Sequence, residues 1–151
     1  MDNPQTSRAI DTIARECIAV RLRVLNRVVT KVYDDALRPL GLKVSQLNIL
    51  VVAAKLGLAR PAQVCALLQL DASTLSRTVE RMRSKGWLEV VPGEDARTQP
   101  FRLAASGKSL LARVVPAWEE AQRQAMDVLG AEGTALLNRV DRKLRVRQAN
   151  A

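Results

Sequence analysis

Side chains able to carry out covalent chemistry are few in this sequence of 151 residues. It contains no histidine and two cysteines, Cys17 and Cys65. Without histidine there is no imidazole acid–base catalysis, no Ser-His or Cys-His nucleophile pair, and no zinc site that needs His ligands. Two thiols are too few for a four-thiolate metal site within one chain. The sequence also lacks a phosphate-binding loop and a paired acidic motif. We therefore expect no enzyme, no cofactor and no metal.

Recognition chemistry is instead concentrated in residues 70–103. Short hydroxyl side chains occur at Ser73, Thr74 and Ser76, and Arg77 follows them. Small hydroxyl residues let a helix backbone approach the bases of a duplex, and an arginine one turn further on can reach a guanine edge or a phosphate. The ordinary alternative is a solvated charged helix face. We predict that these four residues contact DNA.

A second acid and base pair lies in the turn-rich segment PGEDART, at Asp95 and Arg97. An arginine at a loop tip can enter a narrow minor groove, and a nearby carboxylate can hold the guanidinium through a charge-assisted pair. A plain salt bridge in a hairpin is the alternative. We predict that Asp95 and Arg97 also belong to the DNA-binding surface.

Net charge agrees with a polyanionic partner. The formal charge is +9 and the sequence pI is about 10.5, while aromatic residues make up 3% of the chain. So few aromatic side chains cannot build stacking platforms for single strands, so duplex DNA is the better fit. Residues 40–105 carry +4 and the remainder +5, so the basic character is not confined to one segment.

Helical periodicity and turn residues indicate the elements that position these side chains. One long helix is expected from about 9 to 37. Shorter helices should follow: one capped by Ser45 and closed by Gly57, one starting at Pro61, and one over 72–85 capped by Asp71. Residues 87–91 and 101–103 predict a β-hairpin, and 106–129 and 132–147 predict two final helices. The predicted fold class is mainly α with a small β-hairpin wing: a winged helix-turn-helix with a helical stem.

The order of several segments carries a family resemblance. These are LGLKVSQLNIL at 40–50, LDASTLSRTVERMRSKGWLE at 70–89, VPAWEEAQ at 115–122, and the wing with Asp95-Ala-Arg97. In this order and spacing the chain resembles the MarR family of bacterial transcriptional regulators over nearly its whole length. It departs from the family pattern at Arg60, Ala72 and Ala104, where a Ser or Thr cap, a proline and a Thr cap are usual.

The resemblance implies a homodimer that binds double-stranded DNA at a pseudo-palindromic operator. It assigns 1–39 and 106–151 to helical dimerisation and 40–105 to the DNA-binding lobe. It further implies a repressor relieved by a small-molecule effector, such as a small aromatic acid in a cavity near Trp118 and Tyr33, although core packing is the preferred role for Trp118. No signal peptide or membrane-spanning run is apparent, and two unclustered cysteines suit a reducing compartment. We expect a cytoplasmic protein with no membrane partner.

Two alternatives remain open at this stage. Some members of the family sense peroxides through a cysteine in the first helix, which would make Cys17 a redox sensor with Arg21 one turn away; Cys17 also fits a small packed residue on the apolar stripe. Cys65 is expected to be a packing residue. The other alternative is an architectural protein that binds DNA without sequence preference, which predicts a steep salt dependence and no symmetric protected site.

Overall fold

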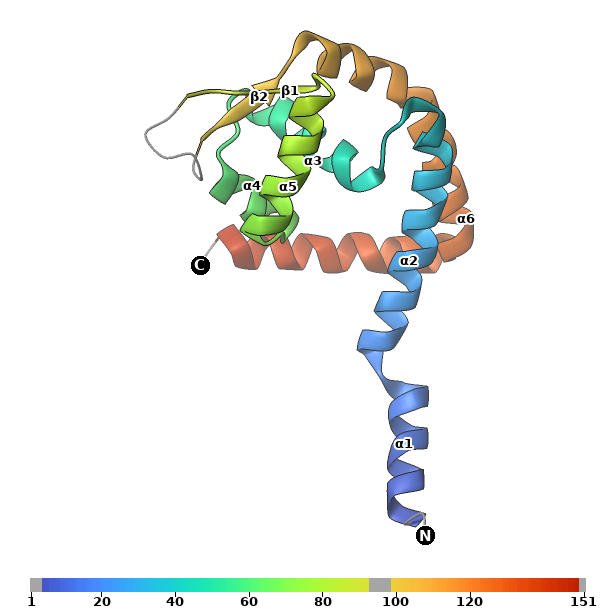
Figure 1. Cartoon of the computed structure of the whole chain (residues 1–151). Helices are drawn as coiled ribbons and strands as arrows, with labels where there is room; N and C mark the ends of the chain where they lie inside the picture. The colour runs from blue at the N-terminus through green and yellow to red at the C-terminus, as the bar shows by residue number, and fades with distance from the viewer. Residues whose placement is uncertain (1–3, 93–98, 150–151) are drawn as a thin grey trace.

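The computed structural model describes residues 4–92 and 99–149. In chain order the elements are α1 (Pro4–Glu16), α2 (Ile18–Leu37), a 3-10 turn (Arg38–Leu40), α3 (Val44–Leu56), α4 (Pro61–Leu68), α5 (Ala72–Ser84), β1 (Leu88–Val90), β2 (Phe101–Leu103) and α6 (Ala105–Ala149). Helices α3, α4 and α5 and the hairpin form a lobe, and α1 with the first half of α2 projects away from it (Figure 1). The predicted class, mainly helical with a β-hairpin, is confirmed.

The long helix expected over about 9–37 is interrupted, so that prediction is wrong in one respect. Cys17 has ψ of 108°, an extended conformation that separates α1 from α2. The break leaves the carbonyl of Arg15 without its regular helical partner, and the Arg21 guanidinium donates a hydrogen bond to it instead. The apolar side chains on either side are exposed, so tertiary packing does not enforce a continuous helix here.

The lobe holds the hydrophobic core. Phe101 is 1% exposed, and Leu37, Leu50 and Leu75 are equally buried, which brings together β2, the end of α2, α3 and α5. Leu110 and Val114 of α6 cover the same core. The last turns of α2 and the first turns of α6 are therefore part of the lobe's packing as well as of the stem.

The wing sheet has the two expected strands and one further bridge. Leu88 pairs with Leu103 and Val90 with Phe101 in an antiparallel hairpin. Ala59, before α4, adds a bridge on the other side of β2: its N–H donates to the Phe101 carbonyl at 2.8 Å, and the Phe101 N–H donates back at 2.9 Å. The hairpin is thereby joined to the start of α4 rather than to α5 alone.

The two final helices are confirmed as two segments meeting at Gly130. Both lie within α6, whose hydrogen bonding continues over Ala105–Ala149, but Gly130 has φ of 67° and ψ of 172°, outside the helical region. A left-handed φ of this kind favours glycine. After Gly130 the chain runs back toward the lobe (Figure 1), and Arg145 of this C-terminal segment lines a cavity together with Leu67 and Leu68 of α4.

The predicted cap of the first lobe helix is also wrong. Helix α3 begins at Val44 with Lys43 as its N-cap residue, so Ser45 lies inside the helix rather than before it. Pro61 at the first position of α4 and Asp71 before α5 are confirmed. The three helices of the lobe therefore start in three different ways.

Within the described residues, no single helix combines the length and apolar character needed to cross a membrane. Residues 5–40 and 44–56 meet the length and composition criteria only when taken together, and they are bent by 77° at the break between them.

Candidate nucleic-acid interface

Asp71 organises the start of α5. Its Oδ1 accepts a hydrogen bond from the Thr74 N–H at 2.8 Å and another from the Ser73 hydroxyl at 2.6 Å, and its Oδ2 accepts from the Thr74 hydroxyl at 2.7 Å. The Ser73 hydroxyl bond, followed by the two bonds from Thr74, holds the pKa of the Asp71 carboxyl well below its usual range. A carboxylate that is ionised at a helix N-terminus is favourable for the helix as well.

Arg77 folds back along the helix toward the same turn. Its Nε donates to the Ser73 carbonyl at 3.2 Å, and its Nη2 lies 3.4 Å from the Ser73 hydroxyl oxygen. Ser73, Ser76 and Arg77 are exposed and Thr74 is half-buried. The structure thus brings the four predicted side chains to the first two turns of α5, with the hydroxyls of Ser73 and Thr74 bonded to Asp71.

The turn before α5 sets its direction relative to α4. Gln69 has φ of 52°, a left-handed conformation that is uncommon for a side chain other than glycine or asparagine. The Leu70 N–H donates to the Cys65 carbonyl at 3.0 Å, which closes the end of α4. Leu75 and Met82 then bury the inner face of α5, so its hydroxyl and arginine face points outward.

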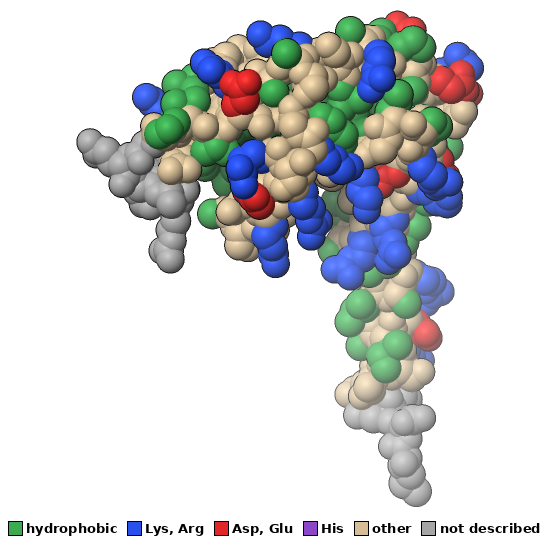
Figure 2. All heavy atoms as spheres, turned by 45° about the horizontal axis from the view of Figure 1, so that its top comes forward, with side chains coloured by type: hydrophobic (Ala, Val, Ile, Leu, Met, Phe, Trp, Pro, Cys, Tyr) green, Lys and Arg blue, Asp and Glu red, His purple; other side chains and the backbone are tan. Residues whose placement is uncertain are grey.

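The other end of α5 carries more cationic groups. Arg83 forms two hydrogen bonds with Glu80, at 2.9 and 2.7 Å, and Arg81 and Lys85 are exposed beside this pair. Figure 2 shows Lys and Arg side chains gathered over both the lobe and the neighbouring part of α2. A cationic face of this extent attracts a polyanion by long-range electrostatics.

The wing prediction falls partly outside the described residues, because Asp95 and Arg97 lie in 93–98. The strands on either side are described. Glu89 of β1 pairs with Arg102 of β2 at 3.0 Å on the exposed side of the hairpin, while Leu88 and Phe101 are buried on the other side. The roles of Asp95 and Arg97 remain predictions.

Many apolar side chains of the stem are exposed in the single chain. One set lies along α1 and the first half of α2, and a second set follows Gly130. The exposed members are Ile10, Ile13, Ile18, Val20, Leu22, Val24, Val28, Leu136, Leu137, Val140, Leu144 and Val146. Extended apolar surfaces of this kind mark interaction sites.

A cavity of about 640 Å³ lies between α3, α4 and α6. Leu47, Val51 and Leu67 supply part of its apolar wall, and Trp118 lines it with 41% of its surface exposed. Lys55 and Arg145 are the cationic residues in the lining. Core packing, the role preferred for Trp118 from the sequence, is therefore wrong.

Tyr33 does not line this cavity. It is half-buried beside the core, and its hydroxyl donates a hydrogen bond to Oε1 of Gln122 in α6. Burial raises the pKa of the Tyr33 phenol. The pairing of Tyr33 with Trp118 around one ligand, which the resemblance suggested, is not what the geometry shows.

The cysteines occupy different environments. Cys65 packs against the hydrophobic core, as expected from the sequence. Cys17 is half-buried at the junction of α1 and α2, with a free thiol. Tyr33 is the only tyrosine in the sequence that could stabilise an oxidised Cys17. It lies sixteen residues further along, roughly 24 Å at the rise of a helix, so it cannot contact Cys17 of the same chain.

A helix-turn-helix formed by α4 and α5, followed directly by an antiparallel hairpin, defines a winged helix-turn-helix protein. Comparison with known proteins narrows the class. The model of the MarR family matches residues 40–98. The chain is 30% identical to the transcriptional regulator MosR of M. tuberculosis, whose structure is in complex with DNA; the TM-score is 0.71, over 89% of this chain and 96% of MosR. The chain belongs to the MarR family.

Two further relatives are informative. The HTH-type transcriptional regulator PecS of Dickeya dadantii is 33% identical over 89 residues, which is 56% of this chain and 54% of PecS. BpsR of Bordetella bronchiseptica, whose DNA binding is regulated by 6-hydroxynicotinic acid, shares the fold with a TM-score of 0.74 at 18% identity, over 86% of this chain and 94% of BpsR. The chain spans about half the length of the curated relatives it matches.

Proposed function

We propose that the protein is a homodimeric transcriptional regulator that binds a specific duplex operator. The observation that carries the proposal is the outward face of α5, where an Asp71-capped first turn presents hydroxyls and Arg77 beside a hairpin wing. A helix of this kind fits the major groove, which is about as wide as a helix. MosR, the relative with the same fold at 30% identity, is a transcriptional regulator in complex with DNA.

Within this interface the side chains have separate roles. Ser76 and Arg77 are exposed and face the bases or phosphates, and Ser73 and Thr74 shape the first turn through Asp71. Arg77 must leave Ser73 to reach a base edge, and its contacts there are two exposed hydrogen bonds that DNA can replace. Asp95 and Arg97 are assigned to contacts with the flanking DNA backbone or the minor groove. The proposal includes no catalytic activity.

The dimer is assigned to residues 1–39 and 106–151, and the DNA-binding lobe to 40–105. The exposed apolar stripes of α1, α2 and the last helix supply a surface that a second copy can cover. Two-fold symmetry would then place two α5 helices in successive major grooves, with half-sites roughly 34 Å, or about ten base pairs, apart.

The cavity between α3, α4 and α6 is assigned to a small aromatic acid that relieves repression. Its apolar wall and Trp118 suit a ring, and Lys55 and Arg145 suit a carboxylate. The cavity lies between helices of the lobe and a helix of the stem, so an occupant that prefers one arrangement of the two shifts the spacing of the lobes. That BpsR responds to 6-hydroxynicotinic acid supports this class of ligand.

The test is selection of duplexes from a random pool by the wild-type protein and by Arg77→Ala. We expect the wild type to enrich one symmetric sequence, and Arg77→Ala to lose discrimination at one position of each half-site by about 1–3 kcal/mol. Enrichment that is unchanged by Arg77→Ala contradicts the role of Arg77. Binding without any enrichment, together with a steep salt dependence, would identify an architectural protein instead.

Redox control through Cys17 is tested separately on the selected operator. Release of wild type by an organic peroxide, with no release of Cys17→Ser, would establish Cys17 as the sensor. Equal release of the two proteins would exclude it.

A further inference from the structure

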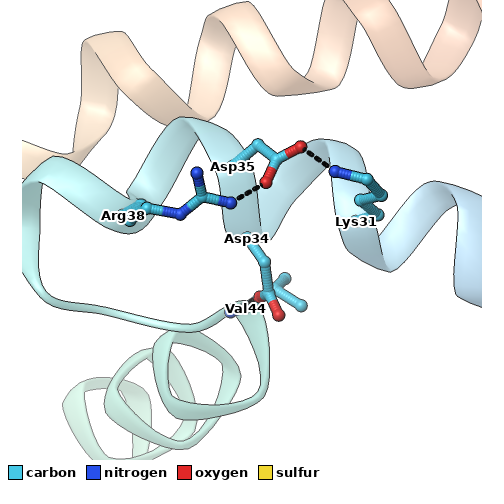
Figure 3. Close-up of polar contacts among 5 residues, drawn as sticks. All are labelled: Lys31, Asp34, Asp35, Arg38 and Val44. Atoms are coloured by element: carbon cyan, nitrogen blue, oxygen red, sulfur yellow. Dashed lines mark hydrogen bonds and ion pairs between the residues drawn. The ribbon is translucent and has the colours of Figure 1, made fainter.

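The first helix of the lobe is capped by a residue of the stem. Helix α3 starts after Lys43, whose side chain has no acceptor for the free N–H groups of the first turn. The Val44 N–H donates instead to Oδ1 of Asp34, at 2.8 Å, and Asp34 lies in α2, ten residues earlier (Figure 3). The Lys43 N–H is satisfied locally, by the Gln46 side chain at 3.0 Å.

The neighbouring carboxylate has different partners. Asp35 accepts from Lys31 at 2.6 Å and also binds the Arg38 guanidinium, both within α2 and the turn that follows it (Figure 3). Its pKa is lowered, first by the hydrogen bond from Lys31. Asp35 therefore makes local ion pairs, whereas Asp34 is half-buried and joins two helices.

The segment between α2 and α3 is held at a second point by α5. The Lys85 ammonium, at the C-terminal cap of α5, donates to the Gly41 carbonyl at 2.9 Å and lies 4.3 Å from the centre of the Trp87 ring. Gly41 has φ of 65°, so the chain turns sharply there. The short connection 38–43 thus contacts the stem helix, the first lobe helix and the end of α5.

From this geometry we propose that Asp34 is a positioning residue that fixes the DNA-binding lobe on the stem. The inference rests on the proposed function and adds to it. In a dimer the two stems set the two-fold axis, so the angle between α2 and the lobe sets the distance between the two α5 helices. The Asp34 carboxylate accepts a hydrogen bond from α3 and makes none with α5. Its effect on the position of α5 therefore passes through the start of α3 and through the connection 38–43, which Lys85 also contacts.

Charge makes the proposal sharply testable. Removing any carboxylate near a duplex should strengthen DNA binding, because one repulsive charge disappears. The positioning role predicts the opposite sign for Asp34→Ala: affinity for the selected operator falls on the order of tenfold, within the usual range for coupling between sites. Asp34→Asn keeps an acceptor for the Val44 N–H and should restore wild-type affinity. Asp35→Ala is the matched control, with the same charge change and no interhelical bond, and should bind at least as tightly as wild type.

Binding to an unrelated duplex separates a positioning role from general damage to the protein. Affinity for an unrelated duplex at low salt should change by less than about twofold in Asp34→Ala, since that binding depends on phosphate contacts. Equal loss on both duplexes, or Asp34→Asn as weak as Asp34→Ala, or Asp35→Ala as weak as Asp34→Ala, overturns the proposal.

A DNA-free measurement keeps the inference distinct from the proposed function. Spin labels at Ser76→Cys, in a Cys17→Ser and Cys65→Ala background, report the distance between the two α5 helices of a dimer. We expect the distribution to broaden or shift with Asp34→Ala and to stay unchanged with Asp34→Asn and Asp35→Ala. If Asp34→Ala leaves the distribution of distances between the two α5 helices unchanged, the positioning role is overturned. This holds whether or not the protein binds its operator. If the wild type selects no duplex, the proposed function fails while this result still stands.

Discussion

The lobe and the stem bury their apolar residues to very different extents. In the lobe, Phe101, Leu50 and Leu75 are at most 1% exposed, and a contiguous core joins α3, α5 and the hairpin. In the stem, Ile13 is 63% and Val24 is 56% exposed. The lobe buries or half-buries most of its large apolar side chains within one chain, whereas α1 and the first half of α2 leave most of theirs exposed. The same helical periodicity thus describes a core in one region and an exposed apolar surface in the other.

The largest expected effect is on the lobe core. Phe101→Ala should lower the free energy of unfolding by about 3–5 kcal/mol, because a large ring that is 1% exposed is lost from the core. Urea denaturation followed by circular dichroism measures this. A loss below about 1 kcal/mol would mean that the lobe does not depend on this core, and the contrast with the stem would disappear.

A substitution in the stem should change the dimer dissociation constant rather than the stability of the lobe. Val24→Asp places a charge on the exposed stripe and should raise the dimer dissociation constant at least roughly a hundredfold, because an unpaired charge would be buried between the copies. Sedimentation equilibrium gives the constant. Leu58→Asp, at a 45% exposed apolar site of the lobe, is the control and should leave the dimer intact. Equal association of the two variants would remove the stem from the interface.

A smaller effect is expected where the two regions meet, in the cavity. Arg145 lines it and pairs with Asp141 at 2.7 Å on the last helix. Arg145→Ala should weaken binding of an aromatic acid by roughly fivefold, since an exposed charged contact contributes modestly. Its effect on the matched aromatic amide should be negligible. Isothermal titration with a panel of acids and amides measures both, and Arg142→Ala is the control on the same helix. Identical affinities in the two variants would exclude a carboxylate contact by Arg145.

The smallest effect concerns the pH dependence of the lobe. The lowered pKa of Asp71 means that its bonds contribute stability above the unfolded-state pKa of about 3.9, and that this contribution is lost as pH falls through the folded-state pKa. Asp71→Asn keeps a capping oxygen but does not titrate, so stability at neutral pH should change little and the acid part of the curve below about pH 4 should flatten. Thermal unfolding across the acid range up to neutral pH tests this, with Asp11→Asn in α1 as the control. A curve that is as steep as wild type would contradict the cap.

Local patterns predicted the lobe well. Asp71 before a run with hydroxyls at the next positions indicated the α5 cap, Pro61 indicated the start of α4, and the change from helical to alternating period indicated the hairpin. Each of these signals acts within a few residues of the chain. The face of α5 that carries Ser76 and Arg77 could be predicted for the same reason.

Features that depend on distant residues could not be predicted. No glycine or proline lies at the break at Cys17, so no local signal predicts it. The apolar side chains on either side of the break are exposed. Asp34 supplies the cap of α3, and Ala59 supplies the extra bridge to β2 of the wing sheet. Trp118 has the periodicity of a core residue but faces a cavity that α3, α4 and Arg145 also line. Tertiary contacts decide the α3 cap, the Ala59 bridge and the place of Trp118, whereas the break at Cys17 lies where such contacts are few.

In the proposed dimer, the stem joins two lobes so that both read one duplex. Hydroxyl-radical footprinting of the wild-type protein on its selected operator tests this most directly. We expect two protected half-sites related by two-fold symmetry, about ten base pairs apart, at a stoichiometry of two chains per duplex. A single protected half-site, or uniform protection without symmetry at moderate salt, would contradict it.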